Sequence, residues 1–453
     1  MKTSLLTKCL IFIGAFLFLF SSCGKDDTNS DNIMVNEWIF DVMTEVYFWY
    51  DEIPTSIRRG TETAPEEYFN SMLYTEEDEW SFITDDYTGL MAEFEGTPKT
   101  LGFAPAFGQF TGTNDVFAVV QYVYDNSPAE KAGLKRGDII LKINGTQLNT
   151  TNYADLTFSD SYTATLGEYS GSGIYETGNT VTMAAVVMEV NPFLLDTVIT
   201  VNDQKIGYMV ITEFTNEENF TKYGEPVFRS LKSQGIKNLV VDLRYNRGGE
   251  MNASIWLASA LAPYTDTWNQ QVLVKLTYND LLQDDADQNN QSIYRFQTIA
   301  EDNLDLNTVY FLTTHYSTAS ASELVIVGLE PYMDVIQVGE NTYGKYTGMW
   351  AIPDTEEPAR HNWGILPIVM KYANANGKTD FKEGLVPDYY LEENPFVDVP
   401  FGDLDDPLFA KAVSLISGFY VESDFKNQQV PMDLVLKSSP KQQLKSNLLV
   451  PRK

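Results

Sequence analysis

Apolar positions at helical spacing open the folded part of the chain. They recur at steps of three and four residues in the stretch "NIMVNEWIFDVMTEVYFWYDEIP": Trp38, Val42, Val46, Trp49 and Ile53. The pattern predicts an amphipathic helix over 32–54 that stops at Pro54 and turns these residues toward a core. A second helix is predicted over 64–73, with Pro65 in its first turn. Residues 36–95 are therefore expected to form a small helical region.

From Thr97 onward the pattern changes to short strands. The runs "TLGFAPAF", "VFAVVQYV" and "IILKI" read as strands, and Ser127-Pro128-Ala129 opens a short helix that Gly133 ends. Asn144-Gly145 predicts a tight turn. The polar stretch 158–179 reads as an insertion. Together these signals indicate a β-rich domain over 96–195.

Strands and helices then alternate. "KIGYMVITEF", "IKNLVVDLRYN", "TVYFLTTHYS" and "DVIQVGEN" predict strands, and helical stretches separate them, including "EMNASIWLASALAP" and "SASELVIVGLEPY". This alternation predicts an α/β layer with mostly parallel strands over 196–420. The polar segment 278–305 is expected to be a solvated loop, because the acidic residues near Asp285 lack the glycine and glutamate of a calcium loop. The fold class is thus a multi-domain α/β chain.

The N-terminal residues predict a targeting signal. Two lysines precede the apolar run "CLIFIGAFLFLF", and small residues follow it, which is typical of a signal peptide over 1–22. Small residues before Cys23 resemble the lipobox of bacterial lipoproteins, and that resemblance implies lipidation of Cys23. Residues 23–35 then form a solvated tether. Its Lys25-Asp26-Asp27 resembles a short signal for the outer face of the outer membrane, so the expected location is the bacterial cell envelope, either periplasmic or extracellular.

Charge and residue supply narrow the chemistry. The net charge of −32 disfavours nucleic acid as a partner. The two cysteines lie at Cys9, in the removed segment, and at Cys23, which leaves no thiol chemistry for the folded part. Only two histidines are present, so a histidine metal site is poorly supplied. No metal or organic cofactor is expected. The C-terminal tail, 421–453, carries five basic residues and no acid from Leu434 onward, and we expect it to be mobile.

Serine and lysine remain as the nucleophile and base candidates. Ser320 precedes a helix, and Lys345 follows 25 residues later in "TYGKYTGMW". A lysine acts as a base when burial lowers its pKa toward about 7–8, and Lys345 has aromatic neighbours and no acid within four residues. Backbone amides at the Gly248-Gly249 turn could stabilise an oxyanion.

Each of these features also has a structural interpretation. Ser320-x-x-Glu323 is a capping box, which by itself indicates a helix start. Asp242-Leu243-Arg244 reads equally as a strand end with a surface arginine. Lys345 alone could face solvent. These alternatives stay open on the residues themselves.

The run "SPAEKAGLKRGDIILKINGTQL" closely resembles PDZ domains. That resemblance implies a domain that adds an extended peptide to a sheet edge and captures its terminal carboxylate on backbone amides. Leu101-Gly102-Phe103 stands where the family keeps its carboxylate-binding loop. Protein or peptide substrates with free C-termini are then the implied partners.

The order of the PDZ run, "VVDLRYNRGG", "STASASELVIVGLE", "VGENTYGK" and "GLVPDYY" resembles the carboxyl-terminal processing (tail-specific) proteases over about 36–420. The resemblance implies that Ser320 is the nucleophile and Lys345 its base. It also implies an oxyanion hole formed by Gly248 or Gly249 with the amide of Ala321. One position departs: the family usually has a glutamine four residues after the lysine, and here Met349 stands there.

The sequence therefore predicts a lipid-anchored serine endopeptidase with a Ser-Lys dyad. The alternative is a peptide-binding lipoprotein whose catalytic site is impaired by Met349 and whose PDZ groove does the work. A third interpretation, a lipoprotein that binds apolar ligands in the cleft, follows from related folds. The natural substrate and the oligomeric state stay unknown.

Overall fold

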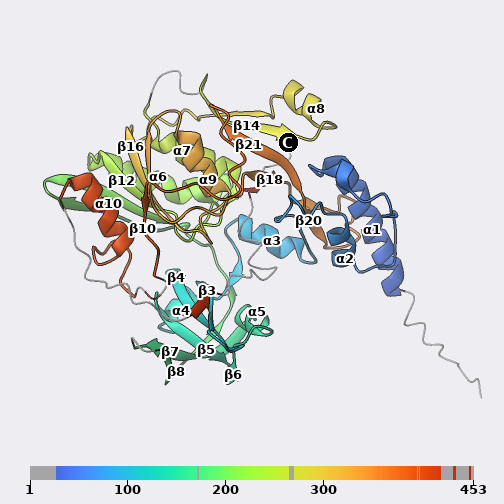
Figure 1. The fold of residues 1–453 in the computed structure, drawn as a ribbon, viewed down its shortest axis with the longest axis horizontal. Helices are drawn as coiled ribbons and strands as arrows, with labels where there is room; N and C mark the ends of the chain where they lie inside the picture. The colour runs from blue at the N-terminus through green and yellow to red at the C-terminus, as the bar shows by residue number, and fades with distance from the viewer. Residues whose placement is uncertain are drawn as a thin grey trace, which may run out of the picture.

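The computed structural model describes residues 27–170, 173–264, 270–394, 396, 398–419, 432–434 and 448–449. It confirms the mixed α/β class: a helical N-terminal region, a β-rich domain and an α/β core follow one another along the chain (Figure 1). The signal segment and Cys23 lie outside the described residues. Across the part of the chain that is described, no helix has the length and apolarity needed to span a membrane.

The N-terminal region packs on the core through helices and one strand. Its elements are α1 (Asp27–Val46), η1 (Tyr50–Glu52), α2 (Pro65–Ser71), β1 (Phe82–Thr84) and α3 (Tyr87–Phe94). The prediction of one helix to Pro54 is wrong, because the backbone N–H of Phe48 bonds to the carbonyl of Ile368 in the core, at 2.8 Å, and leaves the helical ladder. The prediction of a solvated tether over 23–35 is wrong from Asp27 onward, because α1 begins there and Val35 is buried in the main apolar cluster. Strand β1 pairs with β20 (Gly364–Leu366), so this region is joined to the core by backbone hydrogen bonds.

The β-rich domain closes around its own apolar cluster. Its elements are β2 (Lys99–Thr100), β3 (Phe103–Phe110), β4 (Val116–Val123), α4 (Pro128–Lys131), β5 (Ile139–Ile143), β6 (Thr146–Gln147), α5 (Tyr153–Thr157), β7 (Ser161–Tyr169), β8 (Ile174–Ala184) and β9 (Val186–Val187). Reading 158–179 as an insertion was wrong in part. Strand β7 pairs with β5 in the main sheet, and its Tyr162 and Ala164 are buried. Polar residues alternate with these core residues along the strand, so the stretch is polar in sequence although one of its faces is buried.

The core is a six-stranded sheet covered on both faces. In spatial order the strands are β10 (Phe193–Val201), β11 (Gln204–Ile211), β12 (Asn238–Asp242), β16 (Thr308–Thr313), β17 (Asp334–Gly339) and β22 (Tyr389–Tyr390). All neighbours are parallel except β10 and β11. One face carries α6 (Glu217–Ser233), α7 (Met251–Leu261) and α9 (Ala321–Leu329), and the other carries α10 (Pro407–Ser417).

A second sheet lies beyond α9. Its strands, in order, are β13 (Gly249–Glu250), β24 (Leu448–Leu449), β18 (Thr347–Met349), β21 (Ile368–Asn374), β14 (Val272–Tyr278) and β15 (Ile293–Arg295). The segment 278–305 is more ordered than a solvated loop: it holds α8 (Gln283–Gln288) and β15. Asp285 lies inside that helix, and the described residues contain no cluster of acidic, histidine or cysteine side chains arranged for a metal.

Most of the C-terminal tail, which is predicted to be mobile over 421–453, lies outside the described residues. Its described residues form two short strands, β23 (Met432–Leu434) on β3 of the PDZ-like domain and β24 between β13 and β18. In Figure 1 the short red strand lies against β3. A small three-stranded sheet, in the order β1-β20-β19 (β19, Ile352–Pro353), joins the N-terminal region to the core.

Buried ion pairs join the PDZ-like domain to the core. Arg244 is fully buried and pairs with Asp242 at 2.6 Å and with Asp406 at 2.8 Å. Arg136 of the PDZ-like domain reaches the same Asp406 at 3.4 Å and donates to the carbonyl of Val399. The alternative of a surface arginine at the end of β12 is therefore wrong, because Asp406 at the start of α10 draws Arg244 inward.

Candidate active site

Ser320 lies at the start of α9 in an unusual backbone conformation. Its φ is 59° and its ψ −109°, a region that non-glycine residues adopt only when their surroundings enforce it. Its N–H donates to Glu323 at 2.7 Å, and its carbonyl accepts from Leu324 N–H and the Tyr372 hydroxyl. Its Oγ is buried and has no hydrogen-bond partner among the described residues. The backbone of Ser320 is thus fixed by the Glu323 half of a capping box, while its hydroxyl makes no hydrogen bond to the described residues.

Glu323 organises the site more than a capping residue would. Its buried carboxylate accepts hydrogen bonds from Ser320 N–H, Thr342 Oγ1, Gly344 N–H and Lys345 N–H. Burial raises the pKa of Glu323 to about 7, against the lowering effect of these four donors. One carboxylate therefore fixes the backbones of both Ser320 and Lys345.

Lys345 is fully buried at the end of a sharp turn. Gly344 has φ +97°, and a Cβ there would lie 2.1 Å from the carbonyl oxygen of Lys382, so only glycine fits. Burial lowers the pKa of Lys345 to about 7, while the charges of Asp78 and Glu323 act in the opposite direction. A lysine in this state is about half neutral at pH 7 and can accept a proton.

Met349 touches the lysine that it follows by four residues. The Lys345 Nζ donates to Met349 Sδ at 3.3 Å, and the methionine is fully buried. Thr347, two residues after the lysine, has no hydrogen-bond partner for its Oγ1 among the described residues. Tyr346 turns its ring toward Lys371 instead. A thioether thus stands beside the amine where the family keeps an amide.

Asp78 and Tyr372 complete the surroundings of the lysine. Asp78 is buried, accepts from Trp80 N–H and Ser81 N–H on one oxygen, and accepts from Tyr47 Oη on the other. The Tyr372 hydroxyl lies 3.1 Å from the carbonyl oxygens of both Ser320 and Lys345 and donates to them. Sequence reasoning missed both residues, because each comes from a remote segment and no local motif marks it.

The glycine turn lies directly against the serine. A Cβ at Gly248 would be 2.8 Å from Ser320 Cβ and 3.1 Å from Ala321 N, and its φ is +107°. The N–H of Gly248 donates to Asn246 Oδ1 at 2.9 Å, whereas the N–H of Gly249 makes no hydrogen bond to that side chain. At the start of α9, the Ala321 N–H has no acceptor among the described residues. The structure therefore brings Gly248, Ala321 and Ser320 together.

The predicted carboxylate-binding residues lie at the entrance to β3. Gly102 has φ +84°, and a Cβ there would lie 2.1 Å from Ser127 Cβ, so the close approach requires glycine. Leu101 is buried in the domain's apolar cluster, and Phe103 begins β3. These residues are in another domain from Ser320.

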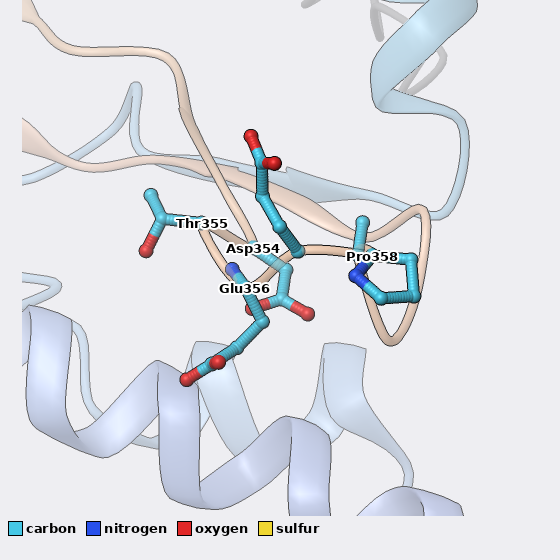
Figure 2. Close-up of a pocket in the computed structure, with 6 residues that line it drawn as sticks. Asp354, Thr355, Glu356 and Pro358 are labelled. Atoms are coloured by element: carbon cyan, nitrogen blue, oxygen red, sulfur yellow. The ribbon is translucent and has the colours of Figure 1, made fainter.

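Two other features do not belong to this site. His315 lies just beyond β16 and not on it, with its Nδ1 3.1 Å from the carbonyl oxygen of Thr342. An open hollow lined by residues 354–359 lies in the loop after β19 (Figure 2). None of its lining residues is among the residues described above, and Asp354 is occupied by an ion pair with Arg360 at 2.9 Å.

Comparison with known proteins defines the class. Residues 205–391 match peptidase family S41, residues 34–82 match the peptidase S41 N-terminal domain, and residues 119–158 match a PDZ domain. The chain belongs to peptidase family S41 and carries a PDZ domain.

The relatives are carboxyl-terminal processing proteases. The chloroplastic C-terminal processing peptidase of Tetradesmus obliquus is 26% identical over 58% of this chain, and the carboxy-terminal processing protease CtpA of Bacillus subtilis is 25% identical over 62%. The chain spans about half the length of each, 54% in both cases. A crystal structure of a protein assigned to the S41 proteases of Bacteroides fragilis is 26% identical, with a TM-score of 0.68 over 84% of this chain and 97% of that one.

Proposed function

We propose that the protein is a serine endopeptidase in which Ser320 and Lys345 form the catalytic dyad. The observation that carries the proposal is the state of Lys345: a fully buried amine with its pKa lowered to about 7, whose backbone shares the Glu323 carboxylate with Ser320. Such a lysine is neutral often enough at physiological pH to accept the proton of a serine hydroxyl.

The reaction follows from this arrangement. Neutral Lys345 takes the Oγ proton as Ser320 attacks a peptide carbonyl carbon. The Ala321 amide and an amide of the Gly248-Gly249 turn donate to the oxyanion. The lysine ammonium then protonates the leaving amine, which leaves an acyl-enzyme. Lys345 next accepts a proton from a water molecule as its oxygen attacks the acyl carbon. The lysine ammonium then returns that proton to Ser320 Oγ as the ester bond breaks, which releases the acyl group as a carboxylic acid and restores the serine.

The PDZ domain is the proposed holder of the substrate. A peptide would add to the edge of β3 with its free carboxylate at the Leu101-Gly102-Phe103 loop, as PDZ domains bind extended C-termini. The substrate class is therefore a protein or peptide with an accessible C-terminal segment. We further propose that Cys23 is lipidated and anchors the enzyme in the cell envelope, at the outer membrane. More than one acyl chain is needed for stable attachment.

The test is cleavage of an unstructured protein by the chain from residue 24, compared with Ser320→Ala and Lys345→Ala. Ser254→Ala and Lys371→Ala are matched controls, because Ser254 is a buried helix serine and Lys371 a partly exposed strand lysine. The dyad predicts activity in the parent and both controls and none in the two site variants. If all five are inert while the parent still binds C-terminal peptides, the protein is the peptide-binding lipoprotein of the alternative interpretation.

A further inference from the structure

The catalytic side chains are covered in this structure. Ser320, Lys345 and Met349 are all 0% exposed. A nucleophile that attacks a polypeptide has to be reached by it, so the structure represents a closed state of the site. Whatever lies at its entrance must leave before a substrate enters.

The C-terminal strand β24 pairs with two segments that flank the dyad residues. Leu448 pairs with Gly249 in parallel register, and Leu449 pairs with both Glu250 and Met349. These partners belong to the glycine turn beside Ser320 and to the strand that follows Lys345. An extended segment held between them takes a strand position that a peptide substrate also needs.

The strand β23 occupies the other proposed substrate edge. Met432, Asp433 and Leu434 pair antiparallel with Phe110, Gln109 and Gly108 on the side of β3 opposite β4. A PDZ ligand adds to this free edge in the same direction, with its carboxylate at the loop before Phe103. The tail therefore covers the end of the β3 edge that is far from the carboxylate-binding loop. If each peptide residue pairs with one further residue of β3, only peptides longer than about five residues reach that end.

The composition of the tail suits this role. Pro431 and Pro451 bound the segment, and both described strands are apolar except for Asp433. Five basic residues and no acid follow Leu434, in a chain with a net charge of −32, so long-range attraction favours the return of the tail to its own molecule. The 13 residues between the two strands reach at most about 43–47 Å when extended.

We propose that the two described tail strands of the chain itself, Met432–Leu434 and Leu448–Leu449, are ligands of the two substrate edges, and that they compete with substrate from within the molecule. This inference rests on the proposed function, because the two edges matter only if substrates use them. A tethered segment has an effective concentration on the order of 1 mM. With an affinity of about 100 µM for each weak strand pairing, the tail raises the apparent KM about tenfold and leaves kcat unchanged.

The experiment compares the full chain with two variants that release the tail. Asp433→Pro with Leu448→Pro removes backbone donors from both strands, and truncation after residue 419 keeps every described helix. Gln442→Pro, between the strands, is the control. The apparent KM for a ten-residue peptide is expected to fall about tenfold in both releasing variants and to stay unchanged in the control. Equal KM values within twofold in all four proteins overturn the proposal.

A binding arm separates this inference from the proposed protease activity. In a Ser320→Ala background, a ten-residue C-terminal peptide is expected to bind more tightly once the tail is released, and a four-residue peptide equally well in both forms. Added peptide 431–453 should weaken binding of the ten-residue peptide to the truncated chain, whereas a scrambled peptide of the same charge should not. If the scrambled peptide competes equally, attraction is electrostatic only and the strand-specific proposal fails. If nothing is cleaved yet these binding differences hold, the dyad falls and the tail assignment stands.

Discussion

Met349→Gln offers the sharpest test of how this site tunes its base. In the structure Met349 Sδ lies 3.3 Å from Lys345 Nζ, and a thioether is a weak acceptor. A glutamine carbonyl at the same place accepts a hydrogen bond from an ammonium, which is worth about 1.5–3 kcal/mol. Allowing for the thioether contact that is lost, the charged lysine gains about 1.4 kcal/mol, which raises the Lys345 pKa by about one unit.

The effect on rate follows from the neutral fraction of the lysine. With a pKa of about 7, about half of Lys345 is neutral at pH 7. With a pKa near 8, only about a tenth is neutral, so kcat/KM at pH 7 falls about fivefold. Above about pH 9 both forms are neutral, and the better acceptor holds the amine at least as well. The plateau is therefore expected to equal or exceed that of the parent.

The assay is kcat/KM for a fluorogenic peptide from pH 5.5 to 10, which reports the pKa of the free enzyme. Met349→Leu is the control, because it keeps an apolar side chain of similar size without an acceptor. The rise of kcat/KM with pH, the rising limb of the profile, should occur at the same pH in Met349→Leu as in the parent. The plateau of kcat/KM should be lower if the sulfur orients the amine. The reasoning is refuted if the limb of Met349→Gln does not move, or if Met349→Leu moves it upward as far.

Four further outcomes follow from the same geometry. Lys345→Met should raise the free energy of unfolding near neutral pH. The pKa of Lys345 is about 7 in the folded chain and has its ordinary value of 10.5 in the unfolded chain. Between these pH values the unfolded chain binds the extra proton, so the free energy of unfolding of the parent rises as the pH rises. The gap between variant and parent in urea unfolding should shrink by about 3 kcal/mol from pH 7 to 9.5. Glu323→Gln should lower kcat/KM at least about 100-fold, since an amide NH2 would face N–H donors; a loss under threefold contradicts this. Asp78→Asn removes a charge that raises the lysine pKa, so the rising limb should move to lower pH, whereas the exposed neighbour variant Glu79→Gln should leave it in place. Gly248→Ala places a Cβ 2.8 Å from the nucleophile's Cβ at a φ of +107°, and a strain of about 1–3 kcal/mol should appear as a lower melting temperature together with lost kcat.

Much of the architecture could be predicted from local pattern. Apolar alternation and helical periodicity located the strands and helices of the core, because burial imposes periods of two and 3.6 on the residues concerned. Predictions failed where a remote partner decided the local outcome. The first helix ends early because Phe48 bonds to Ile368, and β7 joins the main sheet through β5 despite its polar residues.

The candidate site divides in the same way. By itself, the sequence determined which residue types stand in which order: a serine and a glutamate at a helix start, a glycine-lysine turn 25 residues on, and a methionine four residues after the lysine. Only the tertiary structure decided that Lys345 is buried beside Asp78, that Tyr372 joins two carbonyls, and that the described tail residues pair with β3 and β13. The physical reason is that desolvation and strand pairing depend on groups far apart in the chain, and no local window of sequence contains them.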